Sequence, residues 1–179
     1  MNIFHLHKDF DKAALMHNDK HVVKMCVEYA QLMSTSHRVL DGEMYYDKTK
    51  SGAKIRRWRL DSNREPLLYK ASHIDHPSNL WTRKTFSNYM YVYGLWDSLC
   101  KEYTHRYDKI HMSYTKLKDV LIYPPDNISM GPLTEFAQAM PDECKDSDPV
   151  IAYRNYYREH KAEFSKWSKR NVPEWFAER

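Results

Sequence analysis

The start of a predicted helix near residue 20 gathers the residues that are best placed to do chemistry. Lys20, His21 and Lys24 are three basic side chains at a helix N-terminus, where they add to the positive end of the helix dipole. A bound anion would relieve this repulsion, and phosphate is the obvious anion. The alternative is a solvated basic face that Asp19 and Glu28 neutralise.

His17 and His21 are also spaced as two metal ligands on one helix would be, because residues four apart share a helix face. No Glu stands between them as a metalloprotease helix requires, and the spacing assigns no third ligand. A surface or capping role for His17 is the simpler interpretation. We therefore expect no metal site here.

A second basic segment runs from Lys48 to Arg59, with six basic residues and no acidic one. Arg offers two parallel hydrogen bonds to phosphate, and a Trp ring offers a surface for an unstacked base. The alternative is a strand in which Ile55 and Trp58 point to the core and the Arg side chains face water. We interpret the segment as a nucleic-acid contact made by Lys54, Arg56, Arg57, Trp58 and Arg59.

The last 29 residues carry seven bases and four acids, so a helix there could follow a phosphate backbone. Aromatic residues at helical spacing are more often part of a core, however. We predict core positions for Tyr153, Tyr157, Phe164 and Trp167.

The whole chain has the composition of one soluble domain. It has 179 residues, a net charge of +4 and 42% hydrophobic residues, and it contains no apolar run long enough to span a membrane. Aromatic residues make up 14% beside only 4 Gly, which favours a mainly helical fold. Three widely spaced Cys and the absence of a signal-peptide pattern indicate a cytoplasmic protein without disulfides.

Hydrophobic spacing predicts a mainly α, compact single domain over residues 1–179, with a short β-hairpin or irregular arm around residues 43–60. The firmest helix runs from Asn18 or Asp19 to His37, with a buried stripe at Val22, Cys26, Tyr29 and Met33. The other expected segments are a short strand or extended arm at 2–7, helices at 9–16, 79–107, 113–121 and 150–169, a loop at 124–149, and two aromatics after Pro173 that fold back.

Several motifs together resemble a small phage-borne protein family, over nearly the whole chain. We associate this family with the pyrimidine-dimer DNA glycosylases of the endonuclease V type. The motifs are Met1-Asn2-Ile3-Phe4, residues 19–25 with Glu28 and Gln31, His76-Pro77 with Trp81, residues 139–143, residues 153–157, and Pro173-Glu174-Trp175-Phe176.

The resemblance implies a compact helical enzyme that needs no cofactor. In such enzymes the amine of the processed N-terminus attacks the sugar carbon, a Glu assists, and a Schiff base then permits strand cleavage. Aligning Leu15 and Met16 with the shared Leu-Met pair places Lys20 and Lys24 where the family has its two phosphate-binding Arg. It places His21 where the family has its catalytic Glu.

Two departures shape the expectation for this chain. Asn2 is too large for efficient removal of the initiator residue, so Met1 should keep its own amine. With His21 in place of the Glu, either His21 or Glu28, two turns further along, is left as the acid/base group. The expected nucleic-acid contacts are Lys20, Lys24, Lys54, Arg56, Arg57, Trp58, Arg59, His76, Arg83 and Lys84.

The leading hypothesis is therefore a base-excising DNA glycosylase with abasic-site lyase activity, directed at a damaged or modified pyrimidine in double-stranded DNA. The alternative is a non-catalytic phage accessory protein that binds nucleic acid or inhibits a host protein. A His-ligated metallohydrolase ranks last. No membrane partner is expected.

Overall fold

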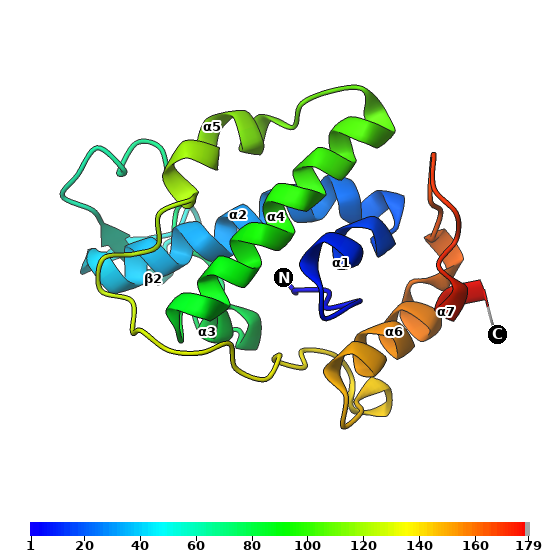
Figure 1. The fold of residues 1–179 in the computed structure, drawn as a ribbon. Coiled ribbons are helices and arrows are strands. Elements are labelled where there is room, and N and C mark those ends of the chain that lie inside the picture. Colours follow the sequence, from blue (N-terminus) through cyan, green and yellow to red (C-terminus); the bar gives the residue numbers. More distant parts are fainter. Residues whose placement is uncertain (178–179) are drawn as a thin grey trace.

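Two long helices, α2 (Asp19–Asp41) and α4 (Phe86–Tyr107), pack against each other at the centre of the molecule (Figure 1). The structure is a computed structural model that describes residues 1–177. Around this pair pack α1 (Phe10–Met16), α3 (Pro77–Thr82) and α5 (Met112–Leu121). The other elements are the strands β1 (Glu43–Lys48) and β2 (Lys54–Arg59), the 3-10 turns η1 (Asp142–Cys144) and η2 (Ala162–Phe164), and the helices α6 (Pro149–His160) and α7 (Glu174–Ala177).

The fold is mainly α with one antiparallel hairpin, as the sequence predicts. One hydrophobic core takes residues from Ile3 to Phe176, and the extended segment 2–6 is buried within it without forming a strand. At its centre the fully buried Trp96 donates from Nε1 to the carbonyl of Cys26 at 2.8 Å. This bond pairs the one polar atom of a large core ring.

The helix α2 begins and ends for local reasons. The side chain of Asn18 accepts a hydrogen bond from the backbone N–H of His21, which confirms the predicted N-cap. The predicted stripe of Val22, Cys26, Tyr29 and Met33 is fully buried. At the other end, a Cβ on Gly42 would lie 2.5 Å from the carbonyl oxygen of Arg38, so only Gly fits where the chain turns into the hairpin.

The predicted single helix over residues 79–107 is wrong, because the chain breaks at 83–85 into α3 and α4. Thr85 adopts an extended conformation, and its hydroxyl accepts from the N–H of Asn88, which starts a new helix. Gly94 lies inside α4, where a Cβ would come within 3.0 Å of the ring of Phe10. The Gly therefore lets α1 approach α4 closely.

The predicted helix over residues 150–169 is too long, since α6 ends at His160. Beyond it the chain packs onto the start of α2, where the N–H of Asp19 donates to the carbonyl of Lys166 at 2.8 Å. The core prediction is confirmed for Tyr153, Tyr157 and Trp167, and is wrong for Phe164, which is half-buried. The aromatics after Pro173, Trp175 and Phe176, fold back and are buried as predicted.

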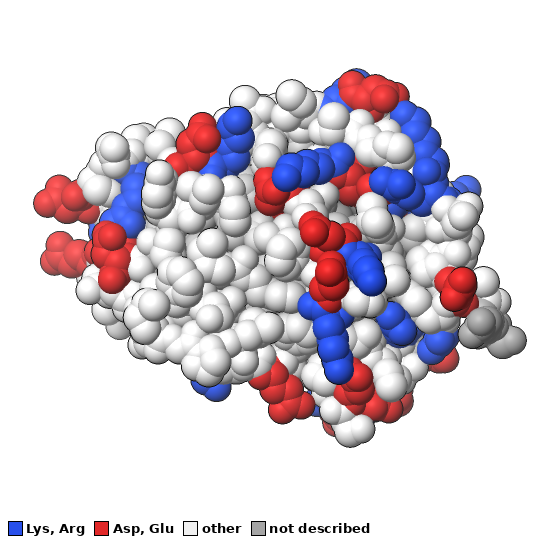
Figure 2. Space-filling view, viewed as in Figure 1, with Lys and Arg blue, Asp and Glu red and all other residues white. Residues whose placement is uncertain are grey.

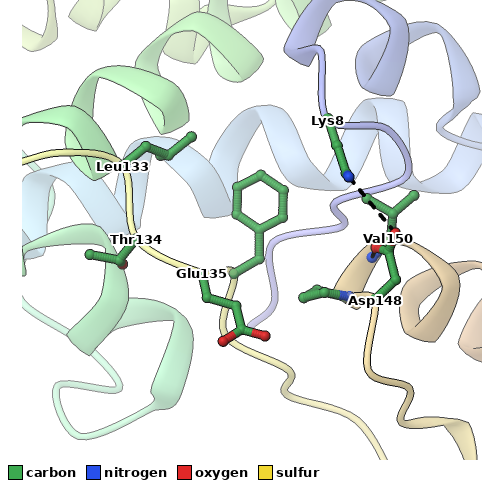
Figure 3. A pocket seen from close by; sticks show the side chains of 8 residues that line it. Lys8, Leu133, Thr134, Glu135, Asp148 and Val150 are labelled. Atoms are coloured by element: carbon green, nitrogen blue, oxygen red, sulfur yellow. Dashed lines mark hydrogen bonds and ion pairs between the residues drawn. The ribbon is translucent and has the colours of Figure 1, made fainter.

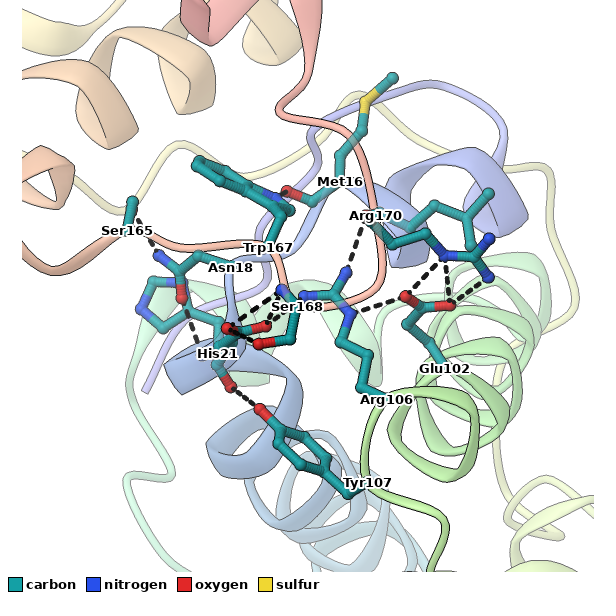
Figure 4. A network of polar contacts seen from close by, with 12 residues as sticks. Met16, Asn18, His21, Glu102, Arg106, Tyr107, Ser165, Trp167, Ser168 and Arg170 are labelled. Atoms are coloured by element: carbon teal, nitrogen blue, oxygen red, sulfur yellow. Dashed lines mark hydrogen bonds and ion pairs between the residues drawn. The ribbon is translucent and has the colours of Figure 1, made fainter.

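A buried ion network joins this C-terminal segment to the helices (Figure 4). Arg106 has a fully buried side chain and lies 2.7 Å from Glu102 and 2.9 Å from Asp19. Arg170 lies 2.8 Å from the other carboxylate oxygen of Glu102. Because each buried charge has an opposite partner, the network holds α2, α4 and the segment after α6 in one arrangement.

Buried histidines within α2 and just before it pair with tyrosines, and His17 is the one that precedes the helix. The N–H of Phe4 donates to the hydroxyl of Tyr29, which donates to Nε2 of His17 at 2.7 Å, and Nδ1 of His17 donates to the carbonyl of Ala13. Burial lowers the pKa of His17 to about 4, so its ring is neutral near pH 7. Both ring nitrogens are thus occupied, and residues 1–177 hold no cluster of three metal-ligating side chains.

Charges are unevenly spread over the face seen in Figure 2. The central left part of this face carries few charged side chains, whereas acidic and basic groups are mixed over its right part. Within residues 1–177 no helix is long and apolar enough to cross a membrane.

Candidate functional site

The N-terminal amine lies beside a carboxylate of α2. The nitrogen of Met1 is 4.0 Å from Oε2 of Glu28, and Nζ of Lys24 is 3.1 Å from Oε1 of the same residue. The Met1 side chain is only 2% exposed while the residue as a whole is half-buried, so its exposed atoms belong to the main chain. The site thus places a carboxylate between two ammonium groups where water reaches them.

Asn2 fixes the position of this amine. Its buried side chain accepts from the hydroxyl of Tyr153 at 2.9 Å and donates to the carbonyl of Ala139 at 2.7 Å. Its Oδ1 also accepts from the N–H of Ile3. Because Tyr153 and Ala139 come from distant parts of the chain, Met1 is held on an anchored segment and not on a loose terminus.

The start of α3 lies next to the amine. His76 caps this helix by accepting from the N–H of Ser78, and its pKa is lowered by burial and then by the positive charge of the N-terminus. Asn79 donates to the carbonyls of Ser72 and His73 at 2.8 and 3.1 Å, and its Nδ2 lies 3.7 Å from the sulfur of Met1. Sequence reasoning selected His76 but missed Asn79, which carries no recognisable motif.

The surroundings of His21 do not favour the acid/base role that the sequence suggested. Its ring stacks on Phe4 with 4.2 Å between centroids, and its Nδ1 lies 2.5 Å from the hydroxyl of Tyr157. Burial is the main cause that lowers its pKa to about 2, followed by the repulsion that His17, when protonated, and the lysines Lys161 and Lys24 would exert on a protonated ring. A ring that stays neutral and whose Nδ1 is already bonded serves packing, which leaves Glu28 as the acid/base candidate.

Three lysines surround this end of α2 and form what we call the lysine strip: Lys20, Lys24 and Lys161. Nζ of Lys20 lies over the ring of Phe164 at 4.3 Å, and Nζ of Lys161 lies over the ring of Tyr156 at 4.5 Å. Because His21 is neutral, the start of α2 carries less charge than the sequence suggests. Lys161 joins the strip only through the packing of α6, so spacing in the sequence gave no signal for it.

The hairpin presents the predicted basic residues with aromatic partners. All six residues of β1 are exposed, and Tyr46 pairs with Arg56 across the strands. Lys54 lies over the ring of Tyr46 at 3.7 Å, and Arg59 lies over the ring of Tyr45 at 5.2 Å. Arg56 bonds Asp75 at 2.5 Å.

Most of the other residues predicted to contact nucleic acid are less exposed than the tip of the hairpin. Arg57 and Trp58 are half-buried, and Nε of Arg57 has no partner among the described residues. Arg83 ends α3, and burial lowers the pKa of its guanidinium. Lys84 is exposed beside it. The ring of Trp58 is therefore less accessible to a ligand than we expected. The exposed aromatic residues of the hairpin are Tyr45 and Tyr46.

Two surface pockets differ in whether residues predicted to bind nucleic acid line them. One has a volume of about 320 Å³ and is lined by residues 133–136 and 148–150 and by Lys8, which lies 4.0 Å from Asp148 (Figure 3). It contains none of the predicted site residues. The other has a volume of about 490 Å³ and lies between the hairpin and residues 71–74. Its lining includes Lys54 and Arg56 from the predicted contacts.

Comparisons with known proteins give no further identification, because no family model, curated protein or solved structure matches the chain.

Proposed function

We propose that the protein is a base-excising DNA glycosylase with abasic-site lyase activity, and that the amine of Met1 is its nucleophile. The observation that carries this proposal is the position of that amine, 4.0 Å from Glu28 on an anchored segment whose main chain is exposed. A free amine next to a carboxylate is the minimum apparatus for Schiff-base chemistry at a sugar carbon.

The chemistry divides between the two groups. Glu28 takes a proton from the ammonium of Met1, and the nitrogen lone pair forms a bond to C1′ while the glycosidic bond breaks and its electron pair leaves with the base. The base takes up a proton from solvent. As the sugar ring opens, the nitrogen loses a proton to solvent and Glu28 returns its proton to O4′, which gives an iminium between Met1 and C1′. The restored Glu28 carboxylate stabilises this positive charge, and loss of a C2′ proton to solvent then expels the 3′ phosphate by elimination.

Binding of the duplex is assigned to the lysine strip and the hairpin. Lys20, Lys24 and Lys161 offer ammonium groups to phosphates near the amine, and Lys54, Arg56 and Arg59 offer further cations on the hairpin. Chemistry at C1′ requires that the target nucleotide leave the base stack. A damaged or modified pyrimidine, which stacks and pairs less well, fits this requirement.

Borohydride trapping tests the proposal directly. The protein is incubated with duplex DNA that contains an abasic site or a pyrimidine dimer, borohydride is added, and covalent adducts are separated by electrophoresis. We expect an adduct with the native N-terminus and none when a short extension precedes Met1, whereas the same extension at the C-terminus should have no effect. Mass spectrometry should locate the adduct on Met1.

Two carboxylate variants sharpen this test. Glu28→Gln should reduce the adduct yield at least about a hundredfold, which is the scale of one general acid/base group. Glu163→Gln, at an exposed position outside the site, should leave it unchanged. An adduct that survives the N-terminal extension, or no adduct with any substrate, would overturn the proposal.

The second candidate function is nucleic-acid binding without catalysis, which the exposed hairpin and its cation–aromatic pairs favour. It predicts duplex affinity that falls steeply with salt and no loss of base or strand from any substrate.

A further inference from the structure

The pocket beside the hairpin combines an aromatic ring, cations and polar groups without partners. Tyr46 is 57% exposed, and Lys54 and Arg56 lie next to it on the same edge. Arg56 gives one N–H to Asp75, and a guanidinium has five to give. The volume of this pocket, about 490 Å³, is within the range of small-ligand pockets.

The floor of this pocket is held in an unusual conformation. His73 has φ = 47°, in the left-handed region that side chains other than Gly seldom adopt. Asn79 keeps it there by donating to the carbonyls of Ser72 and His73, while the N–H of Ser72 donates to the hydroxyl of Thr35. The hydroxyl of Ser72 is itself buried and has no partner among the described residues. Such strain is maintained by surrounding contacts and is common at binding sites.

The pocket adjoins the amine site through two elements. Asn79 contacts both the carbonyls of residues 72–73 and the sulfur of Met1. Along α2, Glu28 and Thr35 are seven residues apart, which is about 10 Å at the rise of an α-helix. A DNA strand bound at Met1 would therefore reach the pocket within a few nucleotides.

We propose that this pocket binds one unstacked nucleotide of the DNA strand, with its phosphate against Lys54 and Arg56 and its base against Tyr46, where it replaces the Lys54 ammonium that lies 3.7 Å from the ring. The inference rests on the proposed function for the identity of the ligand as DNA. It adds a nucleotide site that is separate from the reacting amine.

Binding measurements with the Glu28→Gln variant test the pocket apart from catalysis. The probes are a fluorescently labelled single-stranded hexanucleotide, followed by anisotropy at low salt, and unlabelled thymidine 5′-monophosphate and thymidine as competitors. We expect the monophosphate to compete better than the nucleoside, because the pocket supplies cations. We expect the hexanucleotide to bind more tightly than the monophosphate, because the pocket serves a strand.

Substitutions locate the binding. Tyr46→Ala should weaken hexanucleotide binding by about fivefold or more, the effect of losing one base–aromatic stack, and Arg56→Gln should weaken competition by the monophosphate. The matched control is Tyr123→Ala, at a tyrosine that is 70% exposed outside the pocket, and it should change neither. Circular dichroism checks that each variant is folded.

The outcomes separate the two proposals. Loss of binding in Tyr46→Ala but not in Tyr123→Ala supports the pocket, even if borohydride traps no adduct. Equal affinities in both variants, or a monophosphate that competes no better than thymidine, would overturn it even if the amine proves reactive. Competition by the monophosphate as strong as binding of the hexanucleotide would show a site for free nucleotides and would also overturn the inference.

Discussion

Lowering the pH from 7.5 to 5.5 should destabilise the fold, because burial holds several histidines neutral. His17 is the clearest case. Its Nδ1 donates to the carbonyl of Ala13, and its Nε2 accepts from Tyr29, whose oxygen already accepts from the N–H of Phe4. A protonated ring would have to donate from both nitrogens, and the hydroxyl hydrogen of Tyr29 would then lose its acceptor.

The size of the effect follows from the pKa of His17, which burial lowers from 6.5 to about 4. The unfolded chain then binds a proton below pH 6.5 that the folded chain does not bind until about pH 4. Stability is complete above pH 6.5 and is lost as the pH falls through this window. At pH 5.5 the loss is about 1.4 kcal/mol for one histidine.

Two further histidines act in the same direction. Burial lowers the pKa of His37 to about 4 and that of His21 to about 2. Nε2 of His37 lies 3.0 Å from the hydroxyl of Tyr89, and Nδ1 of His21 lies 2.5 Å from the hydroxyl of Tyr157. Together with His17 they should remove about 4 kcal/mol between pH 7.5 and pH 5.5, a large part of the stability of an ordinary domain.

Urea unfolding, followed by tryptophan fluorescence at both pH values, measures this loss. His17→Gln should lower the free energy of unfolding at pH 7.5, as any change in a core would, but it should also reduce the pH dependence by about 1.4 kcal/mol. The control His105→Gln, at an exposed histidine, should keep the full pH dependence. Equal pH dependence in the wild type and in His17→Gln would refute the reasoning.

Two other substitutions test contacts that hold the site in place. Glu102→Gln should lower the free energy of unfolding by about 3 kcal/mol, because it leaves Arg106 buried without its nearest anion. The control Lys101→Ala breaks an exposed ion pair on the same helix and should cost less than about 1 kcal/mol in the same urea titration. Asn2→Leu keeps a residue too large for removal of Met1 but leaves the carbonyl of Ala139 without its donor, whereas the hydroxyl of Tyr153 keeps the carbonyl of Ala137 as an acceptor. We therefore expect a loss of about 2 kcal/mol and a lower yield of borohydride adduct; an unchanged melting temperature would show that Asn2 does not anchor the terminus.

The sequence alone determined the elements whose signals are local. The N-cap Asn18 and the buried stripe of α2 follow from residue type and helical spacing, and so does the hairpin at 43–60. Where a local signal competed with tertiary contacts, the prediction failed. The helix over 79–107 breaks where Thr85 and Phe86 donate to the carbonyls of Pro132 and Ser129, and α6 stops early because the chain after it packs onto α2.

The site shows the same division more sharply. The resemblance to a glycosylase family suggested the amine of Met1 and the carboxylate of Glu28 as reacting groups, and the basic residues of α2 and the hairpin suggested DNA because Lys and Arg can bind phosphate wherever they lie. Only the tertiary structure decided that His21 is enclosed by Phe4 and Tyr157, and that Asn79 joins the amine to the pocket beside the hairpin. Protonation and proximity depend on neighbours from distant parts of the chain, and spacing along a sequence does not contain them.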